Sequence, residues 1–284
     1  MNKCIKVLLI ISSVLFSLGL IIIITGVLCG GNIKDAISLS DANRDVNLVS
    51  VNKDFSKETI RNLKLDVSAG KVYIKEGKSF RVEGENLVKD SFEIEVRDNT
   101  LYVNESDDFN WSFVFRLGVF FDGGESKITI TVPSGFVFDN TEIEVKAGKV
   151  DIDKFSSNTF DLQLDAGRVD LDNTSVTSKA SIKLNAGAVK AKDYNGKNLE
   201  VEVSAGSCDL SGAFYETLDL SCSAGSINIE SSLSEEEYSY DLDQTAGSIR
   251  INGDSYKEYN NTNKEAKNSI VAKCDAGSIK IDTK

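Results

Sequence analysis

The stretch Leu162-Gln163-Leu164-Asp165-Ala166-Gly167-Arg168-Val169-Asp170-Leu171 holds two alternating apolar segments separated by Ala-Gly. Between Gly148 and Gly225 such pairs are spaced 19, 20, 19 and 19 residues apart. A constant short period indicates a stacked repeat architecture, in which each unit buries its apolar face against its neighbours. The pairs are Ala69-Gly70, Ala147-Gly148, Ala166-Gly167, Ala186-Gly187, Ala205-Gly206, Ala224-Gly225, Ala246-Gly247 and Ala276-Gly277.

Each repeat is predicted to contain two short strands joined by a corner at Ala-Gly. Side chains alternate faces along a strand, so the aliphatic residues five and three positions before each Gly, and two and four after it, share one face. The Ala is expected to point inward as well, and the Gly to let the backbone bend. A ~19-residue unit is too short for a βαβ crossover but fits one rung of a β-solenoid. We therefore predict an all-β, β-solenoid or β-helix-like stack; an antiparallel sandwich of the same strands is the alternative.

The spacing between Gly70 and Gly148 widens to 78 residues, and this insertion (76–141) contains further strand-like runs. Asp98-Asn99 is an acceptable hairpin turn between two of them. We expect an antiparallel sheet that caps the end of the stack. Near the other end, the polar segments Ser231–Ser239 and Gly253–Asn268 are predicted surface loops. The strand-like runs between Gly70 and Gly148 are Phe80–Val82, Phe92–Val96, Leu101–Val103, Lys127–Val132 and Glu142–Val145.

Five cysteines are present, none in a CxxC pair, which argues against a zinc knuckle or a thioredoxin-like site. Cys208, Cys222 and Cys274 replace Val, Leu or Ile in the repeats and are predicted to be small buried apolar side chains. Gln244 falls between Cys222 and Cys274 in one column, where it either turns outward at a bulge or is buried with partners. The two cysteines are thus expected two rungs apart, about 9–10 Å, which is too far for a disulfide.

The N-terminal segment carries Lys3 and Lys6, and residues 7–29 follow without a charge. A helix of that length spans the hydrocarbon core of a bilayer, and the lysines favour a cytoplasmic N-terminus. We expect residues 1–6 in the cytoplasm, 7–29 as a single transmembrane anchor, 30–46 as a linker and 47–284 as an extracellular repeat domain of a single-pass cell-membrane protein. A cleaved signal peptide and a lipoprotein site at Cys29 are the alternatives, so cleavage of the segment stays open.

The composition excludes several classes of function. A net charge of -12 argues against nucleic-acid binding, and the absence of His removes Ser-His and Cys-His catalysis and every His-containing metal site. Four carboxylates stack in a way that suits Ca²⁺, but two lysines complete the same columns and favour a solvated charge ladder. We predict no enzyme activity, no cofactor and no metal site. The ladder residues are Asp151, Asp153, Asp170, Asp172, Lys190 and Lys192.

Two groups of residues are candidate contact surfaces. An aromatic segment either packs over the first rung or touches a membrane, a partner or a second copy. A strip of serines that directly follow the repeat glycines either binds a glycan or another polymer, or is the plain polar outer face of a sheet. The first group is Trp111, Phe113, Phe115, Phe120 and Phe121, and the second is Ser207, Ser226, Ser248 and Ser278.

The Leu-x-Val-x-Ala-Gly-x-Val-x-Ile repeats, the N-terminal apolar segment, the first repeat at Asn62–Lys75 and the insertion ending at Pro133 together resemble the bacterial "putative adhesin" β-strand-repeat family of unknown function. The resemblance covers roughly Ile60 to Lys284. It implies a cell-surface or envelope-stress accessory protein without catalytic residues. We expect a membrane-anchored surface interaction or adhesion module for a wall polymer, a polysaccharide or other glycan, or a cell envelope protein. The alternative is an accessory regulatory subunit of a membrane envelope-stress sensor or transporter.

Overall fold

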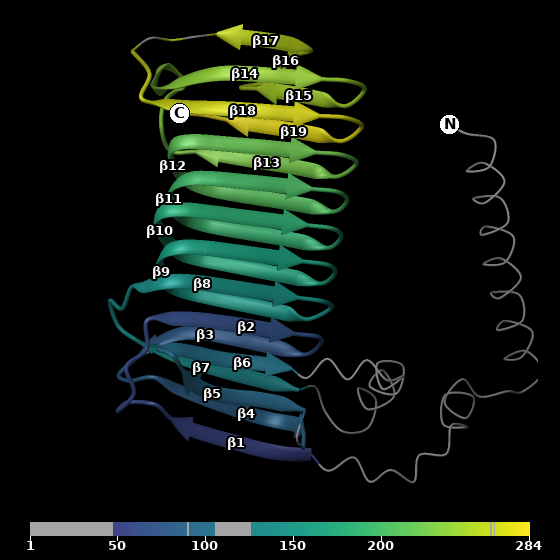
Figure 1. The fold of residues 1–284 in the computed structure, drawn as a ribbon. Coiled ribbons are helices and arrows are strands. Elements are labelled where there is room, and N and C mark those ends of the chain that lie inside the picture. The colour runs from purple at the N-terminus through teal and green to yellow at the C-terminus, as the bar shows by residue number, and fades with distance from the viewer. Residues whose placement is uncertain (1–47, 90, 106–125, 262, 264) are drawn as a thin grey trace, which may run out of the picture. The chain divides into compact units, whose positions relative to one another are not determined.

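The computed structural model describes residues 48–89, 91–105, 126–261, 263 and 265–284, and these form a stack of β-rungs (Figure 1). The prediction of an all-β fold is confirmed, since the one helix in these residues is the 3-10 turn η1 (Glu235–Glu237). The strands are β1 (Leu48–Asp54), β2 (Asn62–Val67), β3 (Lys71–Gly77), β4 (Arg81–Val88), β5 (Phe92–Arg97), β6 (Thr100–Glu105), β7 (Lys127–Pro133), β8 (Phe138–Val145), β9 (Lys149–Leu164), β10 (Arg168–Leu184), β11 (Ala188–Val203), β12 (Ser207–Cys222), β13 (Ser226–Ser231), β14 (Tyr238–Gln244), β15 (Ser248–Ile251), β16 (Asp254–Tyr256), β17 (Glu258–Asn261), β18 (Asn268–Cys274) and β19 (Ser278–Asp282).

Every rung contributes one strand to each of two facing walls. Strands that precede an Ala-Gly pair stack on one another as the pre-glycine wall, and strands that follow it stack as the post-glycine wall. Each long strand from β9 to β12 serves both, because the chain crosses from the post-glycine wall of one rung to the pre-glycine wall of the next. Pairing is parallel and in register: Val169 lies between Val150 and Val189. The parallel solenoid-like arrangement is therefore confirmed over the antiparallel sandwich.

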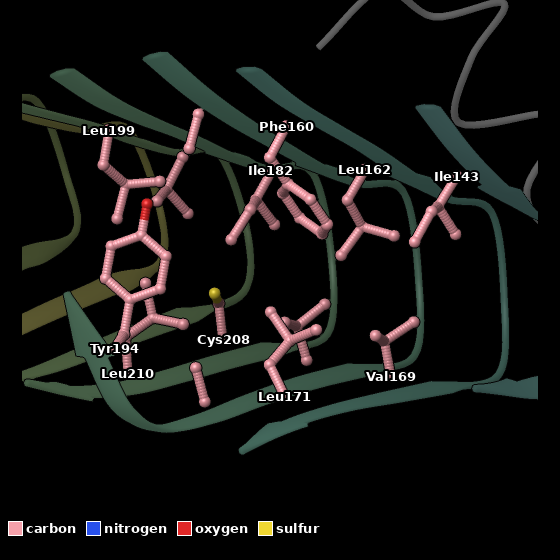
Figure 2. Close-up of a cluster of buried hydrophobic side chains, with 14 of the residues drawn as sticks. Ile143, Phe160, Leu162, Val169, Leu171, Ile182, Tyr194, Leu199, Cys208 and Leu210 are labelled. Atoms are coloured by element: carbon pink, nitrogen blue, oxygen red, sulfur yellow. The ribbon is translucent and has the colours of Figure 1, made fainter. Parts of the chain in front are cut away.

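The core lies between the two walls, where the predicted aliphatic columns meet (Figure 2). Leu162 and Ile182 extend from the pre-glycine wall, and Val169 and Leu171 face them from the post-glycine wall (Figure 2). These four side chains have no exposed surface. The larger side chains predicted to fill the remaining space are also buried: Phe155, Phe160, Val176, Tyr194, Leu199, Phe214 and Leu218.

The corners require left-handed backbone in a repeated place. Gly167, Gly187 and Gly206 have φ values of 104°, 98° and 99°, and a Cβ at any of them would meet backbone atoms of the glycine in the preceding rung. The glycines thus allow both the turn and the close approach of successive rungs.

The prediction that the corner alanines point inward is wrong. Only Ala69 is buried, and the other seven are exposed. The reason is geometric: strand alternation ends with the last core residue, such as Leu164, and the chain then turns while the Ala166 N–H still donates to the Lys146 carbonyl at 2.8 Å. The alanine side chain is left on the outside of the turn. The seven exposed corner alanines are Ala147, Ala166, Ala186, Ala205, Ala224, Ala246 and Ala276.

The insertion forms more than an antiparallel cap. Its strands β6 and β7 pair in parallel with β2 and β3, so they form an extra rung next to the first repeat. Strand β5 then pairs antiparallel with β6, while β4 pairs antiparallel with β7 and with β1. The predicted hairpin turn is present, because Asp98 and Asn99 have φ values of 51° and 59° between the paired residues Arg97 and Thr100.

At the other end of the stack, the order of the rungs differs from the order of the chain. The last rung in sequence, β18 and β19, lies between the β12–β13 rung and the β14–β15 rung (Figure 1). Cys222 and Cys274 are therefore direct register partners, and the expectation that two rungs separate them is wrong. All rungs carry the same apolar columns, so the sequence pattern does not fix which rung stacks on which.

Gln244 lies in the outermost rung rather than between the two cysteines. It pairs with Cys274 on one side, is half-buried, and its N–H donates to the Lys257 carbonyl at 2.9 Å. Within the predicted loop Gly253–Asn268, strands β16 and β17 pair antiparallel with β15 and β14. The cap therefore satisfies the backbone N–H of Gln244, and the half-buried side chain lies at the end of the apolar column.

The predicted anchor at 7–29 and linker at 30–46 lie outside the described residues. Within the described ranges, no helix is long and apolar enough to cross a membrane.

Candidate functional site

The four predicted serines form one continuous row on the outer face of the post-glycine wall. Ser226 pairs with Ser207 on one side and with Ser278 on the other, and Ser278 pairs in turn with Ser248. All four are half-buried. Their N–H groups are used in the stack, since each donates to the carbonyl of the glycine in the neighbouring rung at 2.9–3.0 Å. Their hydroxyls make no side-chain hydrogen bond within the described part of the chain and face solvent.

A second polar column runs beside the serine row. Two residues after each serine come Asp209, Asn228, Arg250 and Lys280, and the register places them in the order Asp209, Asn228, Lys280, Arg250. The Asn228 amide donates to the Asp209 carboxylate at 2.5 Å, and Lys280 pairs with Asp282. The row is thus flanked by an acidic group at one end and basic groups at the other. Sequence analysis did not single out this column, although its two-residue offset from the serines was a usable signal.

The predicted charge ladder lies on the same wall and adjoins the serine row, because Lys190 of the ladder is the register partner of Asp209. The Arg168 guanidinium donates a bidentate pair of hydrogen bonds to the Asp170 carboxylate, from Nε to Oδ2 and from Nη2 to Oδ1, each at 2.8 Å. Lys149 contacts Asp151 at 2.9 Å and Asp170 at 3.5 Å. Hydrogen bonding from Arg168 lowers the pKa of Asp170, and hydrogen bonding to Asp151 raises the pKa of Lys149. The predicted alignment of Asp170 with Lys190 is confirmed, but the ion pairs of Asp170 run to Arg168 and Lys149 instead.

A shallow hollow of about 320 Å³ opens on this face next to the ladder. Tyr73 lines it together with lysines and the stacked carboxylates, and the Lys127 ammonium lies 5.8 Å from the centre of the Tyr73 ring. The described residues contain no group of three or more Asp, Glu, Cys or His side chains arranged to hold a metal ion. Of the carboxylates that line the hollow, Asp151 and Asp170 form ion pairs with Lys149, and Asp170 also pairs with Arg168. The lining residues are Tyr73, Ile74, Lys75, Lys127, Thr129, Asp151, Ile152, Asp153, Asp170 and Asp172.

The outer face of the pre-glycine wall is more acidic. Burial, with nearby Glu200 as the next cause, raises the pKa of Asp219. Ion pairs between rungs reduce this repulsion elsewhere, as between Lys183 and Glu202 at 3.4 Å. This wall is a repulsive surface for polyanions, in keeping with the net charge of the chain.

The structure brings together one of the two predicted contact groups. The serines form a contiguous surface, whereas the aromatic group lies outside the described residues: Trp111, Phe113, Phe115, Phe120 and Phe121.

Comparison with known proteins gives a family and several distant solved structures. The family model "Toastrack DUF4097" matches residues 60–267. A cell adhesion protein from Clostridium sporogenes, described as "putative", is 16% identical with a TM-score of 0.37 over 84% of this chain and 100% of that chain. A "putative lipid binding protein" from Parabacteroides distasonis is 16% identical with a TM-score of 0.41 over 84% of this chain and 98% of that one.

A "putative adhesin" from Bacteroides fragilis is also 16% identical, with a TM-score of 0.36 over 83% of this chain and 98% of that chain. The search of curated proteins found no match. The TM-scores of these solved structures are below 0.5, so they do not contribute to the family assignment. That assignment rests on the family model, which covers most of the chain. The resemblance drawn from the Ala-Gly repeats is thereby confirmed, and the chain belongs to the Toastrack DUF4097 family.

Proposed function

We propose that the protein is a cell-surface interaction module that binds an extended wall polysaccharide or other glycan along the serine row. The observation that supports this is the regular spacing of unused hydroxyls: four serines on four adjacent rungs, one about every 4.8 Å. A polymer with repeated hydroxyl, amide or charged groups meets the same donors and acceptors at each step. Beside the four serines, the flanking column runs from the acidic Asp209 to the basic Arg250, and Lys190 continues the column beyond Asp209.

The proposal includes retention at the cell membrane by residues 7–29, with the repeat domain outside the cell. The uncharged length of that segment and the lysines before it support this topology. Protease treatment of intact cells tests it, since a repeat domain on the outside is degraded while the cytoplasmic N-terminus is protected. Protection of the repeat domain in intact cells would contradict it.

The serine row is tested by replacing all four of its members with Ala in the full chain. The probes are purified peptidoglycan sacculi and the polysaccharide fraction of the same cell walls. We expect the affinity to fall about tenfold or more, because four hydrogen-bonding groups are removed from one contact. Ser156 and Ser175 supply the matched control, since they are also half-buried register partners but lie off the row. Binding of the four-serine variant at the parent level would contradict the proposal.

A photocrosslinking residue at Asn228, beside the row, separates a polymer from a protein ligand in intact cells. A glycan-bearing adduct that glycan-degrading enzymes remove supports the proposal. An adduct that contains a peptide of a second protein, identified by mass spectrometry, instead favours an envelope protein as the partner, including the alternative role as a subunit of a sensor or transporter.

A further inference from the structure

The stack order brings together two cysteines that are far apart in the chain. Cys222 at the end of β12 and Cys274 at the end of β18 are register partners in a parallel pair. Neighbouring strands lie about 4.8 Å apart. This separation falls inside the Cα–Cα range of about 4.4–6.8 Å that disulfides occupy. The backbone is therefore already in place for a bond between the two rungs.

Both side chains point into the core and are 1% exposed. The Cys222 sulfur leans toward the rung that carries Cys274, where it occupies the space beside Gly277 that a Cβ would otherwise fill. Burial raises the pKa of Cys222, the N–H groups of Gly225 and Ser278 oppose that rise, and the adjacent Cys274 thiol adds to it. The Cys274 sulfur occupies the corresponding space beside Gly247 in the next rung. Both thiols therefore lie in the apolar core on adjacent rungs, and no disulfide joins them in this structure.

We propose that Cys222 and Cys274 are a redox modification site that closes into a disulfide between the β12 rung and the β18 rung. The co-reactant is a small aliphatic disulfide. One cysteine thiolate attacks it, forms a mixed disulfide and releases one small thiol. The second cysteine then attacks the protein sulfur of that mixed disulfide and releases the second small thiol. The two cysteines are oxidised, the small disulfide is reduced, and the two protons end on the two small thiols.

The bond holds in place the part of the fold that departs from chain order. Residues 223–273 form the closed loop, and they include the outermost rung, β14 and β15, with its cap strands β16 and β17. In a repeat stack each rung is stabilised only by its neighbours, so the end rungs open first. A bond from β12 to β18 keeps the inserted rung attached when the end opens. Because the thiols are buried, the reagent reaches them only through such opening, and oxidation is expected to be slow.

The experiment incubates the reduced full chain with oxidised glutathione and then digests it for mass spectrometry under non-reducing conditions. We expect a crosslinked peptide pair containing Cys222 and Cys274, and a thermal midpoint about 5 °C or more above that of the reduced chain. Cys208 is the matched control, because it is buried and reduced but has Val189 and Ile227 as register partners. Cys208→Ser should retain the crosslinked pair and the shift, whereas Cys274→Ser should lose both.

The parent chain alone keeps the proposal testable if a variant fails to fold. Stable glutathione adducts at both cysteines, or a crosslink that forms only in urea, would overturn the proposal. An unmodified pair after prolonged incubation at a temperature where the end rungs exchange their amide hydrogens would do the same.

Discussion

Replacing Gly206 by Ala tests the physical reason for the repeated corner. Gly206 has a φ of 99°, and a Cβ there would overlap the carbonyl oxygen of Gly187 and lie 2.9 Å from its nitrogen. The same carbonyl accepts the Ser207 N–H at 3.0 Å, so the rungs must part to admit the methyl group and this bond weakens. One substitution thus strains the backbone, overlaps the next rung and disturbs a hydrogen bond.

The magnitude follows from these three costs. A left-handed conformation costs a residue with a Cβ about 1–2 kcal/mol, overpacking adds about 1–3 kcal/mol, and a weakened hydrogen bond adds up to about 1 kcal/mol. We expect the free energy of unfolding to fall by about 2–6 kcal/mol. Gly253 provides the matched control, because its φ is 93° but a Cβ there meets nothing within 4 Å. Gly253→Ala should therefore cost only the backbone strain, about 1–2 kcal/mol.

Urea unfolding of both full-length variants, monitored by circular dichroism, measures how far each substitution lowers the free energy of unfolding. Amide hydrogen exchange adds the location, since Gly206→Ala should lower protection at the Ser207 N–H and its neighbours in the adjoining rungs. Equal destabilisation by the two substitutions, within about 0.5 kcal/mol, would refute the reasoning. It would mean that the glycine is needed only for its φ and not for the contact between rungs.

Three further predictions concern the core, the charge ladder and the rung order. The hydroxyl of buried Tyr194 has no hydrogen-bond partner among the described residues, so Tyr194→Phe should leave the free energy of unfolding unchanged or raise it. The Tyr238 hydroxyl contacts the Ser231 hydroxyl at 2.8 Å and the Phe214 carbonyl at 3.0 Å. Tyr238→Phe should therefore lower the free energy of unfolding in urea by about 1–3 kcal/mol. Hydrogen bonding from Arg168 lowers the pKa of Asp170 in the folded chain below 3.8, so the Asp170 carboxylate stabilises the fold above that pH. This stabilisation is lost as the pH falls through the lower folded pKa. In Asp170→Asn, the thermal midpoint should therefore decrease less steeply when the pH is lowered. Removal of residues 268–284 takes out an inner rung, so hydrogen exchange should show loss of protection in β14 while β10 keeps its own; retained protection in β14 would contradict the stack order.

The content of each rung could be predicted from the sequence because it depends on local alternation. A residue such as Leu171 or Ile182 is buried whichever rung lies above it, since strand geometry alone sends it inward. The serine row followed from the same logic. The corner alanines could not be predicted in this way, because at Ala166 the chain has left the strand and alternation no longer applies.

The order of the rungs could not be predicted, because parallel pairing recognises the apolar column and not the position in the chain. Ile270 fits beside Leu218 of β12 as well as beside Tyr240 of β14, and the structure places it between them. An outer position for the β18–β19 rung would expose its apolar edge. In the observed order, β14 and β15 are outermost, and the short strands β17 and β16 that follow them in sequence can cover them.

At both ends of the stack, the outermost rung is not the first or last rung in sequence, and the serine row is continuous despite this change of order. The β2–β3 rung lies inside the β6–β7 rung as the β18–β19 rung lies inside the β14–β15 rung. Antiparallel strands pair with each outermost rung: β5 and β4 at one end, β17 and β16 at the other. Such strands block the open edges that would otherwise pair with another stack. Because every rung near the C-terminal end places its serine directly after the glycine, exchanging two rungs exchanges equivalent positions, and Ser278 fills the gap between Ser226 and Ser248. Capping and the continuous hydroxyl surface are therefore compatible in one stack, since the first depends on rung order and the second only on the position within the rung.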